Sequence, residues 1–249
     1  MPKTRLVLLR HGQSQWNLEN RFTGWVDVGL TATGEAEARE AGKRLKQEGF
    51  EFDLCFTSRM QRAIRTAHLA LEELEQLWIP VERHWRLNER HYGALQGLDK
   101  KQTAQRHGEA QTHLWRRSYD VPPPALAITD PQHPRADRRY RDLPPDALPA
   151  TECLKDVVAR FLPCWQDTIV PALRAGRQVI VVAHGNSLRA LMMHLDQISE
   201  EEIAELNIAT GIPIVYELDA DMRPLGHRYL ADEKELAAKV AAVAHQSKA

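Results

Sequence analysis

Two short segments of the sequence place a histidine and a glycine directly after an apolar run. The segment RHGQS at residues 10–14 follows the apolar residues 6–9, and HGNS at residues 184–187 follows residues 179–183. Short apolar runs that end at a turn are typical of buried strands in a parallel sheet. Ligands bind at the carboxyl ends of such strands. If the two strands are neighbours, the imidazoles of His11 and His184 face each other across one pocket.

The chain also carries guanidinium groups suited to phosphate recognition, namely Arg10, Arg62 and the adjacent pair Arg116 and Arg117. Arginine is favoured wherever phosphate is bound by two parallel hydrogen bonds. A neutral imidazole can attack phosphorus, and arginines neutralise the charge on the transferring group. This set predicts phosphoryl transfer through a phosphohistidine. The alternative, in which each histidine only ends a strand and hydrogen-bonds a backbone carbonyl, suits a lone histidine better than a matched pair.

Two further stretches hold groups that can bind or protonate a phosphorylated acid. The irregular residues 12–30 supply hydroxyls, an amide and a glycine N–H as donors, at Ser14, Asn17, Thr23 and Gly24. One predicted loop from Glu89 to Lys100, which contains Tyr92, supplies an acid, a phenol and an ammonium group. A surface glutamate is normally only a solvated charge, and His91 is expected to pack rather than react.

Composition indicates an ordinary globular chain. Its 249 residues are 43% hydrophobic and 27% charged, which predicts one domain over residues 1–249. With 33 basic and 34 acidic residues, no net charge attracts it to nucleic acid or to a membrane. The three cysteines, Cys55, Cys153 and Cys164, show no CxxC spacing, which argues against a disulfide framework or a zinc site. Because no apolar run suits a signal peptide or a membrane span, we expect a cytoplasmic protein.

Sequence patterns predict an α/β protein with alternating strands and helices. Further strands are expected at residues 52–57, 81–85, 213–218 and 224–230, the last two as an antiparallel pair. Helices are expected from a cap at Thr31 or Thr33 to Gly49, after a cap at Ser58, over 109–118, 151–173 and 187–196, after a cap at Ser199, and from Glu233.

Residues 121–149 interrupt this alternation. They contain eight of the fourteen prolines, too many for a core helix or strand. A long loop inside a compact domain is usually functional, so we expect it to cover the active site. The alternative, a disordered linker, would separate nothing here, because one α/β unit continues on both sides.

These motifs together resemble a known family. The strings LLRHGQSQWN, TGW, TSRMQRAIRTA, LNERHYGALQGL, WRRSYD and AHGNSLRAL are similar to those of the cofactor-dependent phosphoglycerate mutases of the histidine phosphatase superfamily. The RHG string alone would indicate only the superfamily, whereas the ERHYGALQG block is specific to the mutase branch. Departures are small: Asp99 stands where asparagine is expected, and Ala209 where proline is common.

The resemblance implies a three-layer fold with a mixed, mostly parallel sheet of six strands, one of them antiparallel. It implies interconversion of 3-phosphoglycerate and 2-phosphoglycerate in glycolysis and gluconeogenesis, primed by 2,3-bisphosphoglycerate, without a metal. His11 would be the nucleophile and Glu89 the general acid and base, while His184, Arg10 and Arg62 would stabilise the phosphoryl group. The remaining binding residues would be Ser14, Asn17, Thr23, Gly24, Tyr92, Lys100, Arg116, Arg117, Gly185 and Asn186. A homodimer and a C-terminal lid over residues 233–249 are also implied.

Three rival functions follow from the same residues. A histidine-type phosphatase would pass the phosphoryl group to water and share both histidines. A metallohydrolase would use His11, His184 and an acid as ligands, but nearby arginines place positive charge where a cation would lie. A non-catalytic phosphate-binding module would bind without turnover.

Overall fold

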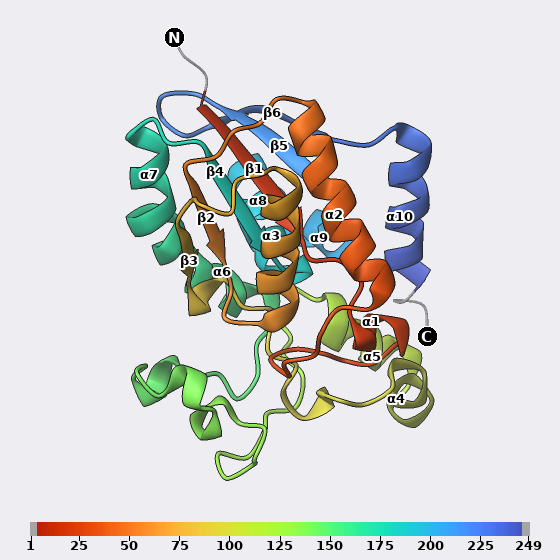
Figure 1. Cartoon of the computed structure of the whole chain (residues 1–249). Coiled ribbons are helices and arrows are strands. Elements are labelled where there is room, and N and C mark those ends of the chain that lie inside the picture. The colour runs from red at the N-terminus through yellow and green to blue at the C-terminus, as the bar shows by residue number, and fades with distance from the viewer. Residues whose placement is uncertain (1–3, 246–249) are drawn as a thin grey trace.

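The computed structural model describes residues 4–245 and contains one central sheet with helices on both faces (Figure 1). In the described chain, six strands pair in the order β3-β2-β4-β1-β5-β6. Their bounds are β1 Thr4–Arg10, β2 Leu54–Thr57, β3 Val81–Arg83, β4 Val179–Ala183, β5 Pro213–Leu218 and β6 Pro224–Tyr229.

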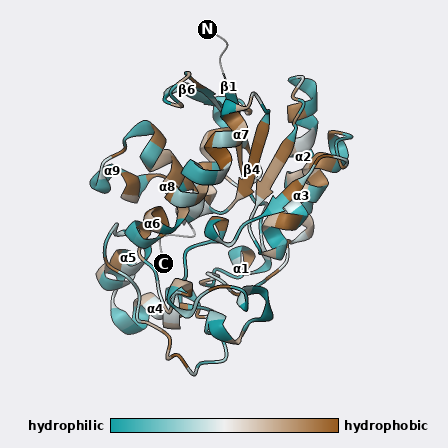
Figure 2. Cartoon of the chain, turned by 90° about the vertical axis from the view of Figure 1, so that its left-hand side faces the viewer, coloured by the Kyte–Doolittle hydropathy of each residue, from teal (hydrophilic) through white to brown (hydrophobic). Residues whose placement is uncertain are grey.

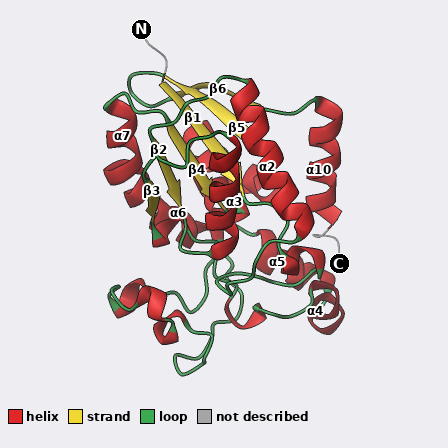
Figure 3. Ribbon diagram, in the orientation of Figure 1, coloured by secondary structure: helices red, strands yellow, loops and turns green. Residues whose placement is uncertain are grey.

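The two histidine-bearing strands are neighbours. Strands β1 and β4 pair in parallel, with Arg10 opposite Ala183, so the next residues of both chains leave the sheet at the same edge. Strand β5 runs antiparallel to β1 and to β6, and β2 and β3 run parallel to β4. The predicted six-stranded sheet with one antiparallel strand is therefore confirmed (Figure 3).

The helices cover the two faces of this sheet. Their bounds are α1 Gln15–Leu18, α2 Ala32–Gln47, α3 Gln61–Glu73, α4 Lys100–His107, α5 Glu109–Arg117, α6 Leu154–Cys164, α7 Val170–Arg174, α8 Gly185–Asp196, α9 Glu200–Glu205 and α10 Glu233–His245. A π-helical turn, Trp165–Ile169, joins α6 to α7.

Successive side chains of a strand point to opposite faces of the sheet, so each central strand packs against both helix layers. Leu6 and Leu8 of β1 belong to a core shared with α6 and α8, whereas Val7 and Leu9 belong to a core shared with α2 and α3. Burial on both faces explains why β1 and β4 read as continuous apolar runs, which form the hydrophobic centre in Figure 2. Removing this apolar surface from water is the main force that fixes the strand ends.

Several predicted boundaries need correction. Strand β3 ends at Arg83, and a 3₁₀ turn, Trp85–Leu87, follows. Lys100 is not in a loop but begins α4, where Asp99 is the N-cap and its Oδ1 accepts from Gln102 N at 2.8 Å. The helix expected from residue 151 begins at Leu154. That expected from residue 187 begins at Gly185, which makes His184 its N-cap.

The proline-rich residues 121–149 form turns and short 3₁₀ segments below the sheet in the view of Figure 3. Tyr140 of this insertion is buried against Trp25, Met60 and Trp85, and its hydroxyl oxygen accepts from Asn88 Nδ2 at 2.9 Å. The insertion thus stabilises the loop that precedes Glu89. Its covering role over the active site stays a prediction.

Helix α10 packs beside α2, where Arg44 pairs with Glu235 at 2.9 Å (Figure 1). Residues 246–249 of the expected lid lie outside the described residues. Within residues 4–245, no helix is long and apolar enough to cross a membrane.

Candidate active site

The carboxyl ends of β1 and β4 bring the two histidines together. The ring centroids of His11 and His184 lie 5.0 Å apart, with the ring planes at 65°. The backbone N–H of His11 donates to the carbonyl of Ala183 at 3.0 Å, which extends the β1–β4 pairing into the site. The juxtaposition that the sequence only predicted is therefore the direct result of parallel pairing.

His11 is held in its neutral form. Burial, followed by the charges of Arg62 and Arg10, holds its pKa well below the usual range. Its Nδ1 lies 2.7 Å from the carbonyl oxygen of Gly12, which can only accept, so Nδ1 carries the proton. The lone pair is left on Nε2, the nitrogen able to attack phosphorus.

His184 is fully buried, and its pKa is likewise held well below the usual range, chiefly by burial and then by Arg62. Its Nε2 lies 2.7 Å from the hydroxyl of Ser58. Ser58 therefore does not cap α3 as expected; the N-cap is Met60, whose N–H donates to Ser58 Oγ at 3.2 Å. Ser58 is a site residue that sequence analysis missed because its position also suits a helix cap.

Backbone carbonyls hold the two inner arginines. Arg62 Nη2 donates to Gly24 O at 2.8 Å and Nη1 to Val26 O at 3.0 Å. Arg10 Nη1 donates to Ile208 O at 2.6 Å, whereas Arg10 Nε is buried without a hydrogen-bond partner in the described chain. An unpaired buried guanidinium N–H is costly, and an anion oxygen at this place would satisfy it.

Gly185 lies close to Arg10. A Cβ at Gly185 would lie 3.4 Å from Arg10 Nε, which is an ordinary van der Waals contact. Gly185 is also the first residue of α8, whose N-terminal N–H groups favour negative charge. The N-terminus of α8 and the Arg10 guanidinium therefore lie side by side at the cavity.

Glu89 presents one of its two carboxylate oxygens to the site. Oε1 accepts from Arg90 N at 2.8 Å and from Asn186 N at 3.1 Å. Oε2 has no partner among the described residues, so it is the oxygen available for proton transfer. The backbone carbonyl of Glu89 accepts from the indole N–H of Trp25, which fixes the loop.

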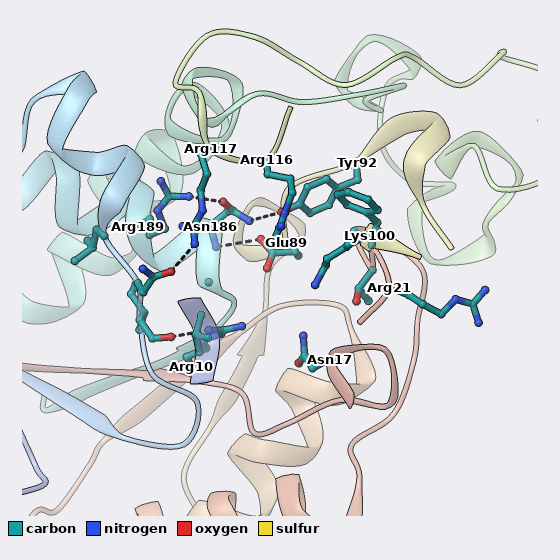
Figure 4. A pocket seen from close by; sticks show the side chains of 18 residues that line it. Arg10, Asn17, Arg21, Glu89, Tyr92, Lys100, Arg116, Arg117, Asn186 and Arg189 are labelled. Carbon is teal, nitrogen blue, oxygen red and sulfur yellow. Dashed lines mark hydrogen bonds between the residues drawn. The ribbon is translucent and has the colours of Figure 1, made fainter. Parts of the chain in front are cut away.

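These groups surround a polar cavity, shown in Figure 4. Eleven residues predicted from the sequence line it: Arg10, Asn17, Thr23, Gly24, Glu89, Tyr92, Lys100, Arg116, Arg117, Gly185 and Asn186. The other four predicted residues, His11, Ser14, Arg62 and His184, are buried just beneath, each at most 3% exposed. Sequence analysis missed seven lining residues, which are Arg21, Phe22, Arg189, Leu206, Asn207, Ile208 and Val243.

Ser14 acts through Asn17 rather than by lining the cavity. Its hydroxyl oxygen caps α1 and lies 2.9 Å from Asn17 Oδ1. Gly24 takes a positive φ of 54°, and a Cβ there would meet Gln96 Oε1 at 2.1 Å. Only glycine lets this loop turn toward Arg62 while Gln96 accepts from Trp25 N.

Cations dominate the rim. Burial, followed by the neighbouring arginines, lowers the pKa of Lys100 to about 7. Burial likewise lowers the pKa of Arg116 to about 10. Arg117 Nη2 donates to Asn207 Oδ1 at 2.5 Å, so the segment after α9 helps to place it. Positive charge at this rim suits an anionic ligand.

The described residues contain no group of three or more His, Cys, Asp or Glu side chains able to hold a metal ion. The arrangement instead joins a neutral imidazole, the unpaired Nε of Arg10 and a carboxylate at one polar cavity. Such a set can transfer a phosphoryl group and move a proton.

Comparison with known proteins agrees with this class of site. A family model described as the histidine phosphatase superfamily, branch 1, matches residues 6–131 and 127–225. The chain therefore belongs to the histidine phosphatase superfamily. Two curated relatives, from Nitratidesulfovibrio vulgaris strains Hildenborough and DP4, are each 60% identical over 98% of both chains. Both are named 2,3-bisphosphoglycerate-dependent phosphoglycerate mutase, which confirms the resemblance to that branch.

Solved structures share the fold. Bacillus stearothermophilus YhfR is 26% identical with a TM-score of 0.66, covering 89% of this chain and 94% of its own. A mycobacterial glucosyl-3-phosphoglycerate phosphatase, solved with VO3, is 25% identical with a TM-score of 0.67. The match covers 91% of this chain and 96% of the phosphatase chain.

Proposed function

We propose that this protein is a 2,3-bisphosphoglycerate-dependent phosphoglycerate mutase that interconverts 3-phosphoglycerate and 2-phosphoglycerate through phospho-His11. The observation that carries the proposal is the neutral His11, with its proton fixed on Nδ1, beneath a cavity rimmed by cations. Relatives that are 60% identical over nearly the whole chain carry the same name.

The residues present fit such a phosphate donor. Arg10 Nε and His184 Nδ1 are buried nitrogens without a partner among the described residues, next to the nucleophile. When bound, 2,3-bisphosphoglycerate supplies the phosphoryl group that His11 carries. Lys100, Arg116, Arg117, Tyr92 and Asn186 hold the carboxylate and the second phosphate, while Asn17, Thr23 and Gly24 line the same cavity.

Each half-reaction balances on the residues described. The Nε2 lone pair of His11 forms a bond to phosphorus as the bond from phosphorus to the donor oxygen breaks. Glu89 gives a proton to the departing alkoxide, and in reverse takes one from the hydroxyl that receives the phosphoryl group. Arg10, Arg62 and His184 stabilise the charge on the transferring oxygens.

Labelled 2,3-bisphosphoglycerate tests the proposal directly. We expect acid-labile label on His11, together with isomerisation of 3-phosphoglycerate. His11→Asn should lose both, with activity falling by several powers of ten, because an amide cannot attack phosphorus. Retention of about a tenth of the activity would remove His11 from the nucleophile role.

A histidine-type phosphatase is the second candidate, favoured by the likeness to a solved phosphatase. The two activities differ in what receives the phosphoryl group of phospho-His11. A mutase retains the organic phosphate until it has reoriented, which the set of rim cations favours. The ratio of inorganic phosphate release to 2-phosphoglycerate formation separates the two.

We also propose that catalysis needs no metal. The positive charge that a metal would supply is already present in Arg10, Arg62 and the rim cations. EDTA should leave turnover unchanged, whereas vanadate, which can adopt the geometry of transferring phosphorus, should inhibit. Activity lost with EDTA and restored by zinc or manganese would favour the metallohydrolase.

Helix α10 is proposed as part of a lid over the site, together with the residues that follow it and with the proline-rich insertion. Val243 of α10 lines the cavity. Lys239 pairs with Glu37, whose other oxygen accepts from Gln13 N at 2.8 Å. The lid is thereby linked to the loop that follows the nucleophile.

A homodimer in the cytoplasm is the proposed state of the enzyme. Among the described residues, strand β3 is an edge strand that pairs only with β2, and a second copy can add its own β3 across a two-fold axis. Beside this edge, the side chains of Leu77 and Trp78 are 50% and 75% exposed. All three cysteines are free and buried, which suits a reducing compartment.

A further inference from the structure

Asn186 is the one side-chain amide on the α8 side of the cavity, and Arg189 lies one turn further along the same helix. Arg189 Nη1 donates to Asn186 Oδ1 at 2.9 Å. Figure 4 shows the two side chains joined at the cavity wall. Arg189 is only 4% exposed, so this contact is shielded from water.

The chemistry of arginine fixes the orientation of the amide. A guanidinium has only donors, so the Asn186 atom that faces it has to be the oxygen. The NH₂ group is then turned away from Arg189 and donates to Tyr92 Oη at 3.5 Å. The rotated amide would place NH₂ against the guanidinium N–H groups and lose the contact with Arg189, and its oxygen would then accept from the Tyr92 hydroxyl.

The second anchor of Arg189 makes this orientation rigid. Its Nη2 donates to the carbonyl of Ile203 in α9, so the guanidinium is fixed between two helices. Arg189 Nε is buried with no partner among the described residues, and burial lowers the pKa of the group to about 9. A buried charge with an unsatisfied donor weakens folding relative to an apolar side chain of similar size. Its presence is better explained by placement of the amide than by stability.

We propose that Arg189 is a positioning residue that makes Asn186 a hydrogen-bond donor, and never an acceptor, toward the carboxylate or phosphate oxygens of the substrate. The proposal rests on the function proposed above. Because Asn186 Nδ2 donates to Tyr92 Oη, the Tyr92 hydroxyl keeps its own proton for the substrate as well. Two neutral donors thus select an anionic, fully deprotonated ligand.

The test is a double-mutant cycle on Arg189→Met and Asn186→Ala, with KM and kcat measured for 3-phosphoglycerate. Arg189→Met should raise KM roughly tenfold, the usual effect of losing a hydrogen bond to a charged group, and should change kcat much less. In the Asn186→Ala background, Arg189→Met should change KM by less than about twofold, because its effect passes through the amide. Arg189→Lys, which keeps a donor, should recover part of the loss.

Asn186→Asp sharpens the test, because a carboxylate can only accept. It should raise KM more than Asn186→Ala, since it brings negative charge to the anion site. Arg86→Met is the matched control: Arg86 Nη1 also donates to a carbonyl, that of Arg160 at 3.0 Å, but Arg86 does not line the cavity. Its KM should stay at the wild-type value.

Two results would overturn the proposal. An unchanged KM in Arg189→Met excludes a positioning role, and an equal further rise in the Asn186→Ala background shows that Arg189 acts independently of the amide. If Arg189→Met does not fold, as judged by circular dichroism, the cycle is run with Arg189→Leu, which also lacks a donor, and the same criteria hold. Labelling of His11 is scored in the wild type and in every variant. Absence of label in the wild type would contradict the proposed function rather than this inference.

Discussion

The two oxygens of the Glu89 carboxylate have different surroundings, which makes a sharp prediction about its role. In Glu89→Gln, the amide oxygen can still accept from Arg90 N and Asn186 N, while the NH₂ group replaces Oε2. Shape is kept but the proton carrier is lost. We expect kcat to fall by roughly 10²- to 10⁴-fold with little change in KM, measured by steady-state kinetics. Glu82→Gln, at an exposed residue of β3, is the control, and a change confined to KM would make Glu89 a binding residue only.

Lys100 predicts the pH dependence of substrate binding. Its pKa of about 7 in the free enzyme, lowered chiefly by burial, means that it loses its proton as the pH rises through neutrality. An anionic substrate favours the protonated form, so binding should take up a proton and weaken as the pH rises above about 7. Calorimetric titration with 3-phosphoglycerate in buffers of different ionisation enthalpy measures both effects. Lys100→Arg should bind with an affinity that is nearly constant over this range, and an unchanged pH dependence would contradict the assignment.

At the scale of elements, α10 offers a test of the lid. Lys239→Met removes the contact with Glu37 and leaves the cavity-lining Val243 in the chain. We expect lower mutase kcat and a higher ratio of inorganic phosphate release to 2-phosphoglycerate formation, because water reaches phospho-His11 more easily. Deletion of residues 240–249 should have the same effect more strongly.

Lys234→Met is the matched control, since Lys234 is an exposed lysine on the same helix. The ratio of inorganic phosphate release to 2-phosphoglycerate formation in this variant should equal that of the wild type. Labelling of His11 should survive in all of these variants. An unchanged ratio in the deletion variant would leave closure to the proline-rich insertion.

For the whole molecule, the exposed residue Trp78 tests the proposed dimer. A carboxylate in its place would be buried without a partner between two copies, so Trp78→Asp should convert the dimer to a monomer in sedimentation velocity. Leu225→Asp changes a side chain that is 58% exposed on β6, at the opposite edge of the sheet, and should leave the mass unchanged. A wild-type protein that sediments as a monomer at micromolar concentration would contradict the dimer.

The sequence by itself determined the class of fold and predicted most of the residues that line the candidate site. A strand buried on both faces requires a continuous apolar run, so β1 and β4 were predicted from their apolar runs alone. A histidine that directly follows each run has to emerge at the carboxyl edge. The sequence left the cap of α2 open between Thr31 and Thr33, and the structure has it at Thr31, whose hydroxyl oxygen accepts from Gly34 N.

Only the tertiary structure decided which polar atoms meet. Ser58 fits a helix cap equally well by sequence, and its contact with His184 depends on β2 lying beside β4. Arg189 reads as an ordinary helical arginine until α9 is placed against α8. Hydrogen-bond partners distant in sequence leave no local periodicity, since they arise from the packing of elements. Local patterns therefore predicted the elements and the nucleophile, whereas the partners that orient the binding groups were set by the fold.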